Sequence, residues 1–198
     1  EVEFRQANLF DLGVAFRENI SEHAVMEIER IPGVYYSEGY RAVPVRMIAD
    51  HRTYLTSIEG YNTEMKLRQL LDTQQQAVPI PEDGLLINRK LGEVLNIGLG
   101  DSVSVEFMDG SGRQADILVA GFINQYFGLS SYMNIEKLNR LLPEKRVVSG
   151  TYLAIDRQYE DAITQTLKES PYVGEIIAKQ RLIERFYEST AQTWLIIV

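Results

Sequence analysis

The sequence predicts an α+β fold, in which a split ferredoxin-like layer of sheet and helices carries an inserted, small β-rich subdomain. Alternating strand and helix patterns at both ends of the chain predict the layer. A block of short alternating strands joined by turn residues lies in the middle of the chain and predicts the insertion. A polar connector over 62–82 separates the first pattern from this block.

The first part of the chain has the pattern of a strand, a helix and two further strands. Alternating apolar residues predict a long strand over 2–16. Ser21 suits a helix N-cap, apolar residues behind it form one helical face, and Pro-Gly at 32–33 ends that helix. The tract 34–58 is rich in β-branched and aromatic residues and is broken at 49–51, so it predicts a hairpin.

The last part of the chain has the pattern of a strand, a helix and a strand. Residues 151–155 have strand composition, 159–167 place apolar residues at helical spacing, and 173–178 again have strand composition. Together with the first part they would complete one sheet with its helices on one face.

The middle of the chain predicts a compact unit of its own. The connector has a short helical piece and a Gln-rich exit with prolines, which is typical of a boundary. Residues 84–148 follow it and alternate in strand fashion, with Asn88 and Asn134 placed to cap two short helices. Its expected strands and turn are 85–87, 103–107, 115–119 and the hairpin turn 109–112.

The composition excludes several classes of function. The net charge is −8 and no run of Lys or Arg forms the basic stripe that a phosphate backbone requires, so we expect no nucleic-acid partner. The chain has no cysteine, which excludes disulfides, zinc–thiolate sites and thiol nucleophiles. Its 2 histidines are too few for a His-rich metal site. We expect neither a metal nor a cofactor.

Acidic pairs, histidines and a serine pair are the remaining candidates for catalysis. Most of the acids flank a loop or helix start or lie on a polar helix face, and none is placed to orient a histidine. The serines lack the Gly-x-Ser-x-Gly setting of a hydrolase nucleophile. The candidates are Glu27 with Glu29, Glu82 with Asp83, Glu160 with Asp161, His23, His51 and Ser130 with Ser131. We expect no catalytic residue and no enzyme, with an acid–base hydrolase as an alternative.

The segment LNIGLGDSVSVEF contains two glycines that could either hold a phosphate or turn the chain. A dinucleotide-binding loop follows a strand and opens a helix. Here the expected helix comes first and a strand follows, and Val103 stands where a third glycine would be required. We therefore interpret Gly98, Gly100 and Asp101 as a structural turn, in which the glycines supply positive φ.

Tyrosine is frequent, with 11 residues, and several of them lie in the first hairpin. On a strand, a tyrosine usually packs with its hydroxyl at the edge. The alternative is a contact surface for a protein or an amphiphile, formed by Tyr35, Tyr36, Tyr40 and Tyr54. Such a surface would suit a soluble periplasmic binding or adaptor module.

The two ends of the chain suggest a segment of a membrane protein. The chain begins at Glu1 without Met or a signal-peptide pattern, which indicates a processed or excised segment. It ends in TAQTWLIIV, and a membrane span needs about 20 apolar residues. We expect 191–198 to be the start of a truncated transmembrane helix, with the membrane-proximal residues Trp194, Leu195, Ile196 and Ile197. A last strand of a soluble fold is the alternative.

Several segments, in the same order, resemble the extracytoplasmic domains of MacB/FtsX-type ABC transporter permeases. GLLINRKLGEVLNIGLGDSVSVEF resembles their segment of short helix, Gly-Asp turn and alternating strand, and FGLSSYMNIEKLNRLL resembles their stretch of Gly, aromatic-Met and Leu-rich helix. IPGVYYSEGYRAVPVRM is similar to their Pro-Gly-Val and Val-Pro-Val strand pair, and SGTYLAID is likewise followed by a helix. ERFYESTAQTWLIIV resembles the approach to their second transmembrane helix.

The resemblance implies the first of two extracytoplasmic domains of a long permease in the bacterial inner membrane. A porter-like α+β subdomain would comprise 1–70 plus 149–190, and the inserted β-rich subdomain 71–148. A separate cytoplasmic subunit would hydrolyse ATP. The domain would move mechanically to act on amphiphilic, lipid-like or peptide cargo, or on a periplasmic partner protein. The family has no fixed catalytic or ligand residues in this region, so it assigns none.

Overall fold

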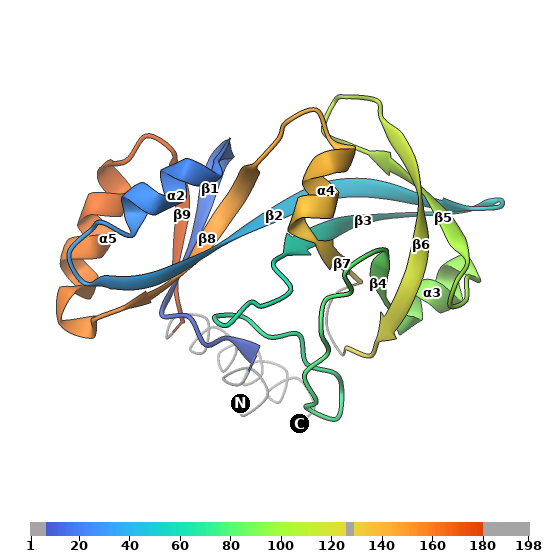
Figure 1. Cartoon of the computed structure of the whole chain (residues 1–198), viewed down its shortest axis with the longest axis horizontal. Helices are drawn as coiled ribbons and strands as arrows, with labels where there is room; N and C mark the ends of the chain where they lie inside the picture. The colour runs from blue at the N-terminus through green and yellow to red at the C-terminus, as the bar shows by residue number, and fades with distance from the viewer. Residues whose placement is uncertain (1–6, 126–128, 180–198) are drawn as a thin grey trace, which may run out of the picture.

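The computed structural model describes residues 7–125 and 129–179, whose strands form one nine-stranded sheet with the order β3-β7-β4-β6-β5-β2-β8-β1-β9 (Figure 1). The strands are β1 (Leu12–Ser21), β2 (Val34–Ala49), β3 (Arg52–Tyr61), β4 (Leu85–Asn88), β5 (Ser102–Phe107), β6 (Gln114–Ile123), β7 (Ser131–Asn134), β8 (Val147–Ile155) and β9 (Val173–Ala178). The helices are α2 (Glu22–Ile28), α3 (Arg89–Leu95), α4 (Ile135–Leu141) and α5 (Glu160–Glu169), and a 3₁₀ turn over Arg157–Tyr159 precedes α5.

The long strand β2 belongs to both ends of the molecule (Figure 1). Its first part, 34–40, pairs with β8, whereas 41–49 pairs with β3 and, over 45–48, with β5. We call β1, α2, residues 34–40, β8, α5 and β9 the terminal half, and residues 41–49, β3 to β7, α3 and α4 the middle half. β2 has 16 residues, and at about 3.3 Å per residue it forms a continuous span of roughly 50 Å.

Each half has a core of its own. In the terminal half, Leu12 and Leu153 of the sheet pack with Ile163 and Leu167 of α5. In the middle half, the inward-facing residues of β2 to β6 pack with leucines of α3 and α4. A third core lies where the halves meet, and it contains several aromatic rings covered by the connector 62–82.

Strand β1 differs from the strand that the sequence predicts over 2–16. It begins at Leu12 and continues to Ser21, through a stretch where its pairing with β8 is irregular. Residues 1–6 lie outside the described part of the chain, and Asn8 forms an isolated bridge with the connector. The predicted bounds were wrong because the neighbouring strands β8 and β9, not the apolar alternation alone, determine where β1 can pair.

The first hairpin and the helix starts are confirmed. β2 and β3 turn at Asp50, which takes a φ of 51°, where the sequence predicts a break at 49–51. Ser21, Asn88 and Asn134 each accept a hydrogen bond on the side-chain oxygen from a backbone N–H in the first helical turn. The predicted β9 has the same bounds in the structure, Val173–Ala178.

Two features of the middle of the chain differ from the prediction. The connector 62–82 contains turns and isolated bridges and no helical piece. Its backbone N–H groups bond partly outside the connector, as Gln69 does to the carbonyl of Ala7 at 2.8 Å, and partly across its own turns, as Val78 does to the carbonyl of Leu70 at 2.8 Å. These bonds take the place of those that a helix would form. Strand β7 was not predicted, and it pairs in parallel with β3.

The fold is therefore a mixed α/β fold dominated by its sheet, as the sequence predicts at this level. The boundaries of the two subdomains stay a prediction. The core of the middle half combines 43–58 with 85–142, so the second part of the first hairpin packs with the block that follows the connector.

Candidate functional site

The junction between the halves lies at two consecutive residues of β2. Tyr40 is opposite Gly150 of β8, and Arg41 is opposite Gly60 of β3. Because successive side chains of a strand point to opposite faces of the sheet, Tyr40 and Arg41 face opposite sides of this junction. The two sides are built from different chemistry.

On one face, Arg41 is completely buried, with 0% of the residue exposed. Its guanidinium donates to the Asn139 side-chain oxygen on α4 and, at 3.2 Å, to the backbone carbonyl of Glu144. It also forms an ion pair of 2.9 Å with the Glu144 carboxylate. Burial lowers the pKa of Arg41, and the nearby Glu144 opposes this shift. Arg41 thus ties β2 to the segment that leads from α4 into β8.

On the other face, Tyr40 belongs to an aromatic cluster that spans both halves. We define this cluster as Phe10, Tyr40, Tyr61, Tyr132 and Tyr152. The ring centroids of Tyr40 and Tyr152 are 4.8 Å apart, and those of Phe10 and Tyr152 are 4.7 Å apart. Stacked rings at this spacing contribute beyond the area that they bury. The cluster therefore joins β2, β8 and the segment just before β1 to β3 and β7.

Arg68 of the connector lies over this cluster. Its guanidinium carbon is 5.7 Å from the ring centroids of both Tyr61 and Tyr152, within the range of a cation–π interaction. It donates to the Tyr152 hydroxyl at 2.9 Å and lies 3.8 Å from the Glu59 carboxylate. Since Glu59 is on β3 and Tyr152 is on β8, Arg68 bridges the two halves.

The hydroxyl groups of Tyr61 and Tyr132 act as donors, Tyr61 to the Glu59 carboxylate and Tyr132 to the Gln125 side-chain oxygen. Burial raises the pKa of Tyr61 well above its usual value and raises the pKa of Tyr132 to about 12. Burial also raises the pKa of Tyr40. At neutral pH the Tyr61 hydroxyl therefore keeps its proton, and it donates a hydrogen bond of 2.5 Å to the Glu59 carboxylate.

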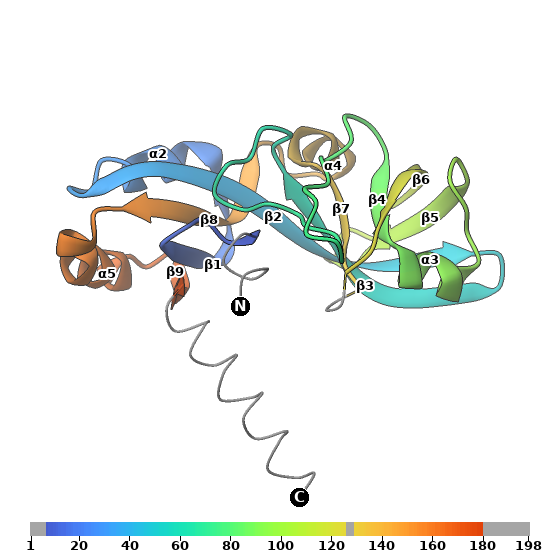
Figure 2. The same cartoon turned by 90° about the horizontal axis from the view of Figure 1, so that it is seen from below.

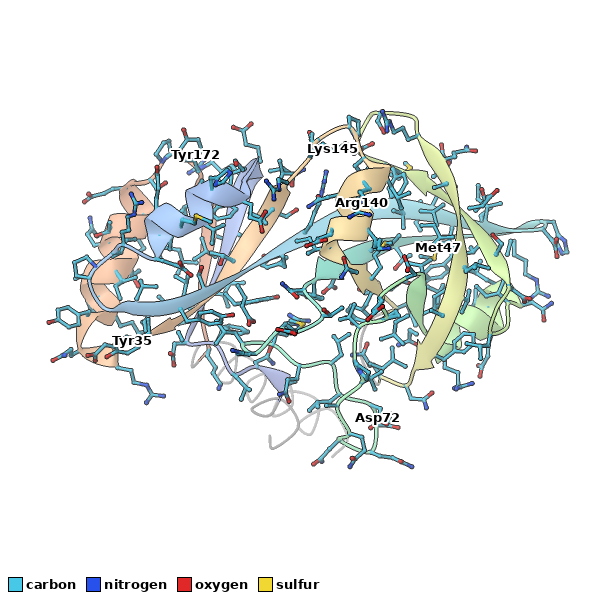
Figure 3. All side chains as sticks on the ribbon, viewed as in Figure 1. Tyr35, Met47, Asp72, Arg140, Lys145 and Tyr172 are labelled. Carbon is cyan, nitrogen blue, oxygen red and sulfur yellow. The ribbon has the colours of Figure 1, made fainter. Side chains whose placement is uncertain are left out.

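Glu38 of β2 fixes the start of the connector against the junction. Its two carboxylate oxygens accept hydrogen bonds from the backbone N–H groups of Lys66 and Leu67, at 2.6 and 2.7 Å. Leu67 is buried in the same core as the aromatic cluster. Asp72 marks the outer tip of the connector (Figure 3).

The four tyrosines that the sequence proposes as a contact surface do not lie together. Tyr35, 71% exposed, is at the outer end of the terminal half, where its hydroxyl donates to Asp156 (Figure 3). Tyr36 is 39% exposed and lies under Lys66, 5.8 Å from its ring centroid. Tyr40 is in the aromatic cluster, and Tyr54 packs against the core of the middle half. Whether any of them binds a ligand stays a prediction.

The glycine segment after α3 forms a turn that leads into β5. Asn96 takes the left-handed conformation at the helix end, with a φ of 57°. The Gly98 N–H donates to the Asp101 carboxylate at 2.7 Å, and the Gly100 N–H donates to the Val119 carbonyl at 2.9 Å. Gly100 has a φ of +83°, but Gly98 does not have positive φ, so the expectation that both glycines supply it was wrong for Gly98. Asn96 takes that role instead.

Some of the candidate catalytic residues form contacts with neighbouring elements. Asp83 forms an ion pair with Lys137, and Glu29 accepts from the backbone and hydroxyl of Ser37. Glu160 and Asp161 lie in the first turn of α5. His23 lies in the first turn of α2 and His51 in the hairpin turn. Ser130 lies beside Ser57, Ser131 is buried, and Glu27 and Glu82 are exposed.

Within 7–125 and 129–179, no group of three or more His, Asp or Glu side chains is placed to hold a metal ion. None of the helices in these ranges is both long and apolar enough to cross a membrane. Trp194, Leu195, Ile196 and Ile197 lie outside the described residues, so their membrane-proximal position stays a prediction.

No family model and no curated relative matches the sequence. Two solved structures share its fold. The periplasmic region of MacB from Actinobacillus actinomycetemcomitans matches with a TM-score of 0.57 and 10% identity, covering 92% of this chain and 95% of that chain. The extracellular domain of the noncanonic ABC-type transporter YknZ from Gram-positive bacteria matches with a TM-score of 0.51 and 12% identity, covering 78% and 87%. The resemblance seen in the sequence segments is thus confirmed at the level of the fold.

Proposed function

We propose that this chain is the extracytoplasmic domain of an ABC transporter permease subunit and is not itself an enzyme. A separate cytoplasmic subunit hydrolyses ATP, and the domain converts that cycle into movement outside the bacterial inner membrane. The movement acts on amphiphilic, lipid-like or peptide cargo, or on a periplasmic partner protein. The shared fold over most of the chain supports the general kind of protein.

The observation that carries the mechanical part of the proposal is the continuity of β2 across the junction. A strand with neighbours hydrogen-bonded along its length transmits displacement from one half to the other. Arg41 and Arg68 oppose bending at the point where β2 changes its partners. Movement of the terminal half would therefore carry the middle half with it.

The entry points of the chain support the same proposal. Leu12 at the start of β1 is opposite Ala178 at the end of β9, and these two strands are neighbours in the sheet. Figure 2 shows the ends of both strands on the same side of the terminal half. Flanking membrane helices would thus act on one place in the terminal half, whereas β5 and β6 belong to the middle half.

The order of the strands supports a porter-like, split ferredoxin-like layer as part of this proposal. β2, β8, β1 and β9 are adjacent in that order and antiparallel, with α2 and α5 packed on a common core. The block between β2 and β8 would then be the inserted subdomain. With this assignment the boundaries 1–70 plus 149–190 and 71–148 would be adjusted so that residues 41–61 join the insertion.

The proposal is tested first by the coding sequence on either side of the chain. An apolar span of about 20 residues before Glu1 and another that continues from Trp194 would support it. A stop codon or a polar linker after Val198 would overturn it. The better hypothesis would then be a periplasmic binding or adaptor module, which the exposed Tyr35 and Tyr36 favour.

Movement is tested in the full-length protein reconstituted in lipid nanodiscs. The 198 residues contain no cysteine, so once any cysteine elsewhere in the full-length protein is replaced, Asp116→Cys on the exposed side of β6 labels one position only. We expect energy transfer from this label to a headgroup-labelled lipid to change when an ATP analogue binds the cytoplasmic subunit. A pair of labels at Arg30→Cys and Asp116→Cys, one in each half, should keep its distance. A constant lipid distance, or a changing pair distance, would contradict the rigid coupling.

A further inference from the structure

A groove of about 290 Å³ lies beside the junction, between α2 and the start of the connector. One face of α2 forms its first wall, through Glu22, Val25, Met26 and Glu29, whose spacing places them on the same side of a helix. Residues 36–39 of β2 form its floor, and Glu64 and Lys66 lie on the opposite wall. The groove is therefore lined by both halves of the molecule and by the connector.

The charge of the groove is unbalanced. Four carboxylates, those of Glu22, Glu29, Glu38 and Glu64, line it together with a single ammonium group, that of Lys66. Glu29 and Glu38 already accept backbone N–H groups. Like charges gathered in one concave site attract a cation from solution.

Apolar side chains line the groove together with these charges. Met26 on α2 is 54% exposed although it faces a concave site, and Tyr36, whose ring lies under the Lys66 ammonium group, lines the same groove. Val148 of β8 and Ile135 of α4 contribute further apolar surface. A concave site with apolar walls and a few polar groups at defined positions is the usual form of a small-molecule site.

The dimensions and the backbone decide between the possible occupants. The groove is too small for a helix, whose diameter with side chains is about 10–12 Å. An added peptide strand is also disfavoured, because β2 over 36–39 pairs only with β8 among the described residues and the N–H of Ser37 on its open edge is occupied by Glu29. A small molecule with an apolar part fits both conditions.

We propose that this groove binds a small cationic amphiphile, with its amine near Glu22 and Glu64 and its hydrocarbon against Met26 and Tyr36. The inference rests on the proposed function in that it names a class of cargo for the transporter. Because α2, β2 and the connector all line the groove, a bound ligand would contact the same elements that Arg68 and Glu38 hold together. Occupancy of the groove would then stabilise the junction.

Binding is tested on the 198-residue chain with three probes that share an eight-carbon tail. Octyltrimethylammonium, octyl sulfate and octyl glucoside are titrated below their micelle concentrations, and two-dimensional ¹⁵N NMR follows the backbone. We expect the cationic probe to bind about tenfold more tightly than the sulfate, with the changed signals in α2 and residues 62–66. Equal binding of the three probes, or changes centred elsewhere, would overturn the proposal.

Matched variants test the roles of the charges and of the apolar wall. The double variant Glu22→Gln with Glu64→Gln should lower the affinity for the cationic probe about fivefold. Glu93→Gln with Glu175→Gln removes the same charge at exposed positions of α3 and β9 and should leave its affinity unchanged. Met26→Ala should weaken both charged probes by about threefold, because it removes apolar contact that both tails share. An equal loss in the two double variants would show that only the net charge matters, which contradicts a site in the groove.

The outcomes separate this inference from the proposed function. A polar linker after Val198 with selective cation binding would reject the transporter and leave the groove as the site of a binding module. Membrane spans on both sides without selective binding would support the transporter and reject the groove as its cargo site.

Discussion

The two faces of the junction carry an arginine each, yet they compensate its charge in different ways. Arg41 is buried and contacts an amide oxygen, a backbone carbonyl and a carboxylate. The side chain of Arg68 remains 30% exposed and lies over two neighbouring aromatic rings, with a hydroxyl and a more distant carboxylate at its edge. One site replaces water with oxygen ligands, and the other replaces it mainly with ring faces.

This difference predicts on which face of the junction a substitution destabilises the fold more. A fully buried guanidinium depends on every partner, because water cannot replace one that is lost. The Nε of Arg41 has no hydrogen-bond partner among the described residues, so this site has no spare acceptor. Arg68 keeps access to water, and its rings can adjust. We therefore expect substitutions on the Arg41 face to cost more than those on the aromatic face.

Arg41→Ala should have the largest effect on stability. It removes the charge, leaves the Asn139 side-chain oxygen and the Glu144 backbone carbonyl without this donor and opens a cavity, so we expect a loss of about 3 kcal/mol in the free energy of unfolding. Denaturant unfolding at neutral pH measures it. Arg41→Met is the control, since it fills the space without a charge, and it should cost less than half as much. A loss below about 1 kcal/mol for Arg41→Ala would contradict the comparison.

Arg68→Ala should cost less, about 2 kcal/mol, from two cation–π contacts and the hydrogen bond to Tyr152. The same unfolding experiment measures it. Arg113→Ala, at an exposed position before β6, provides the control and should change stability by less than about 0.5 kcal/mol. If Arg68→Ala cost more than Arg41→Ala, the order of the two faces would be reversed.

Alkaline unfolding tests the buried hydroxyl groups of the aromatic face. The pKa of Tyr132 is raised to about 12 in the folded chain, whereas an unfolded tyrosine titrates near 10. The protonated Tyr132 hydroxyl contributes fully to the free energy of unfolding below pH 10. This contribution falls by about 1.4 kcal/mol per pH unit as the pH rises from 10 toward 12. Tyr132→Phe should make the fall in stability between pH 10 and 12 less steep by that amount. Parallel curves for the two proteins would exclude this contribution.

A turn outside the junction gives the smallest effect and sets the scale for the others. Gly100→Ala places a side chain at a φ of +83°, and we expect a loss of about 1 kcal/mol. Gly98→Ala is the matched control, since its φ is not positive and an added Cβ would be 3.4 Å from the Asp101 carboxylate. It should cost clearly less. Equal losses would mean that the conformation of Gly100 is not what constrains this turn.

Local signals in the sequence were sufficient for much of the fold. Ser21, Asn88 and Asn134 predict the starts of their helices, because an N-cap side chain bonds to a backbone N–H only two or three residues further along the chain. The break at 49–51 and the glycines at 110 and 112 predict two hairpins, because the geometry of a turn also depends on a few consecutive residues. Strand β7 gave no such signal, because it has four residues and owes its existence to β3 and β4.

The sequence by itself determined the class of fold, the helix starts, the first hairpin and a resemblance that the fold then matched. Only the tertiary structure decided the junction. In the sequence, Arg41 is one more strand residue and Arg68 is one more residue of a polar connector. Their partners Asn139, Glu144 and Tyr152 are 98, 103 and 84 residues away along the chain. Burial and long-range pairing are properties of the packed sheet, and no local pattern encodes them.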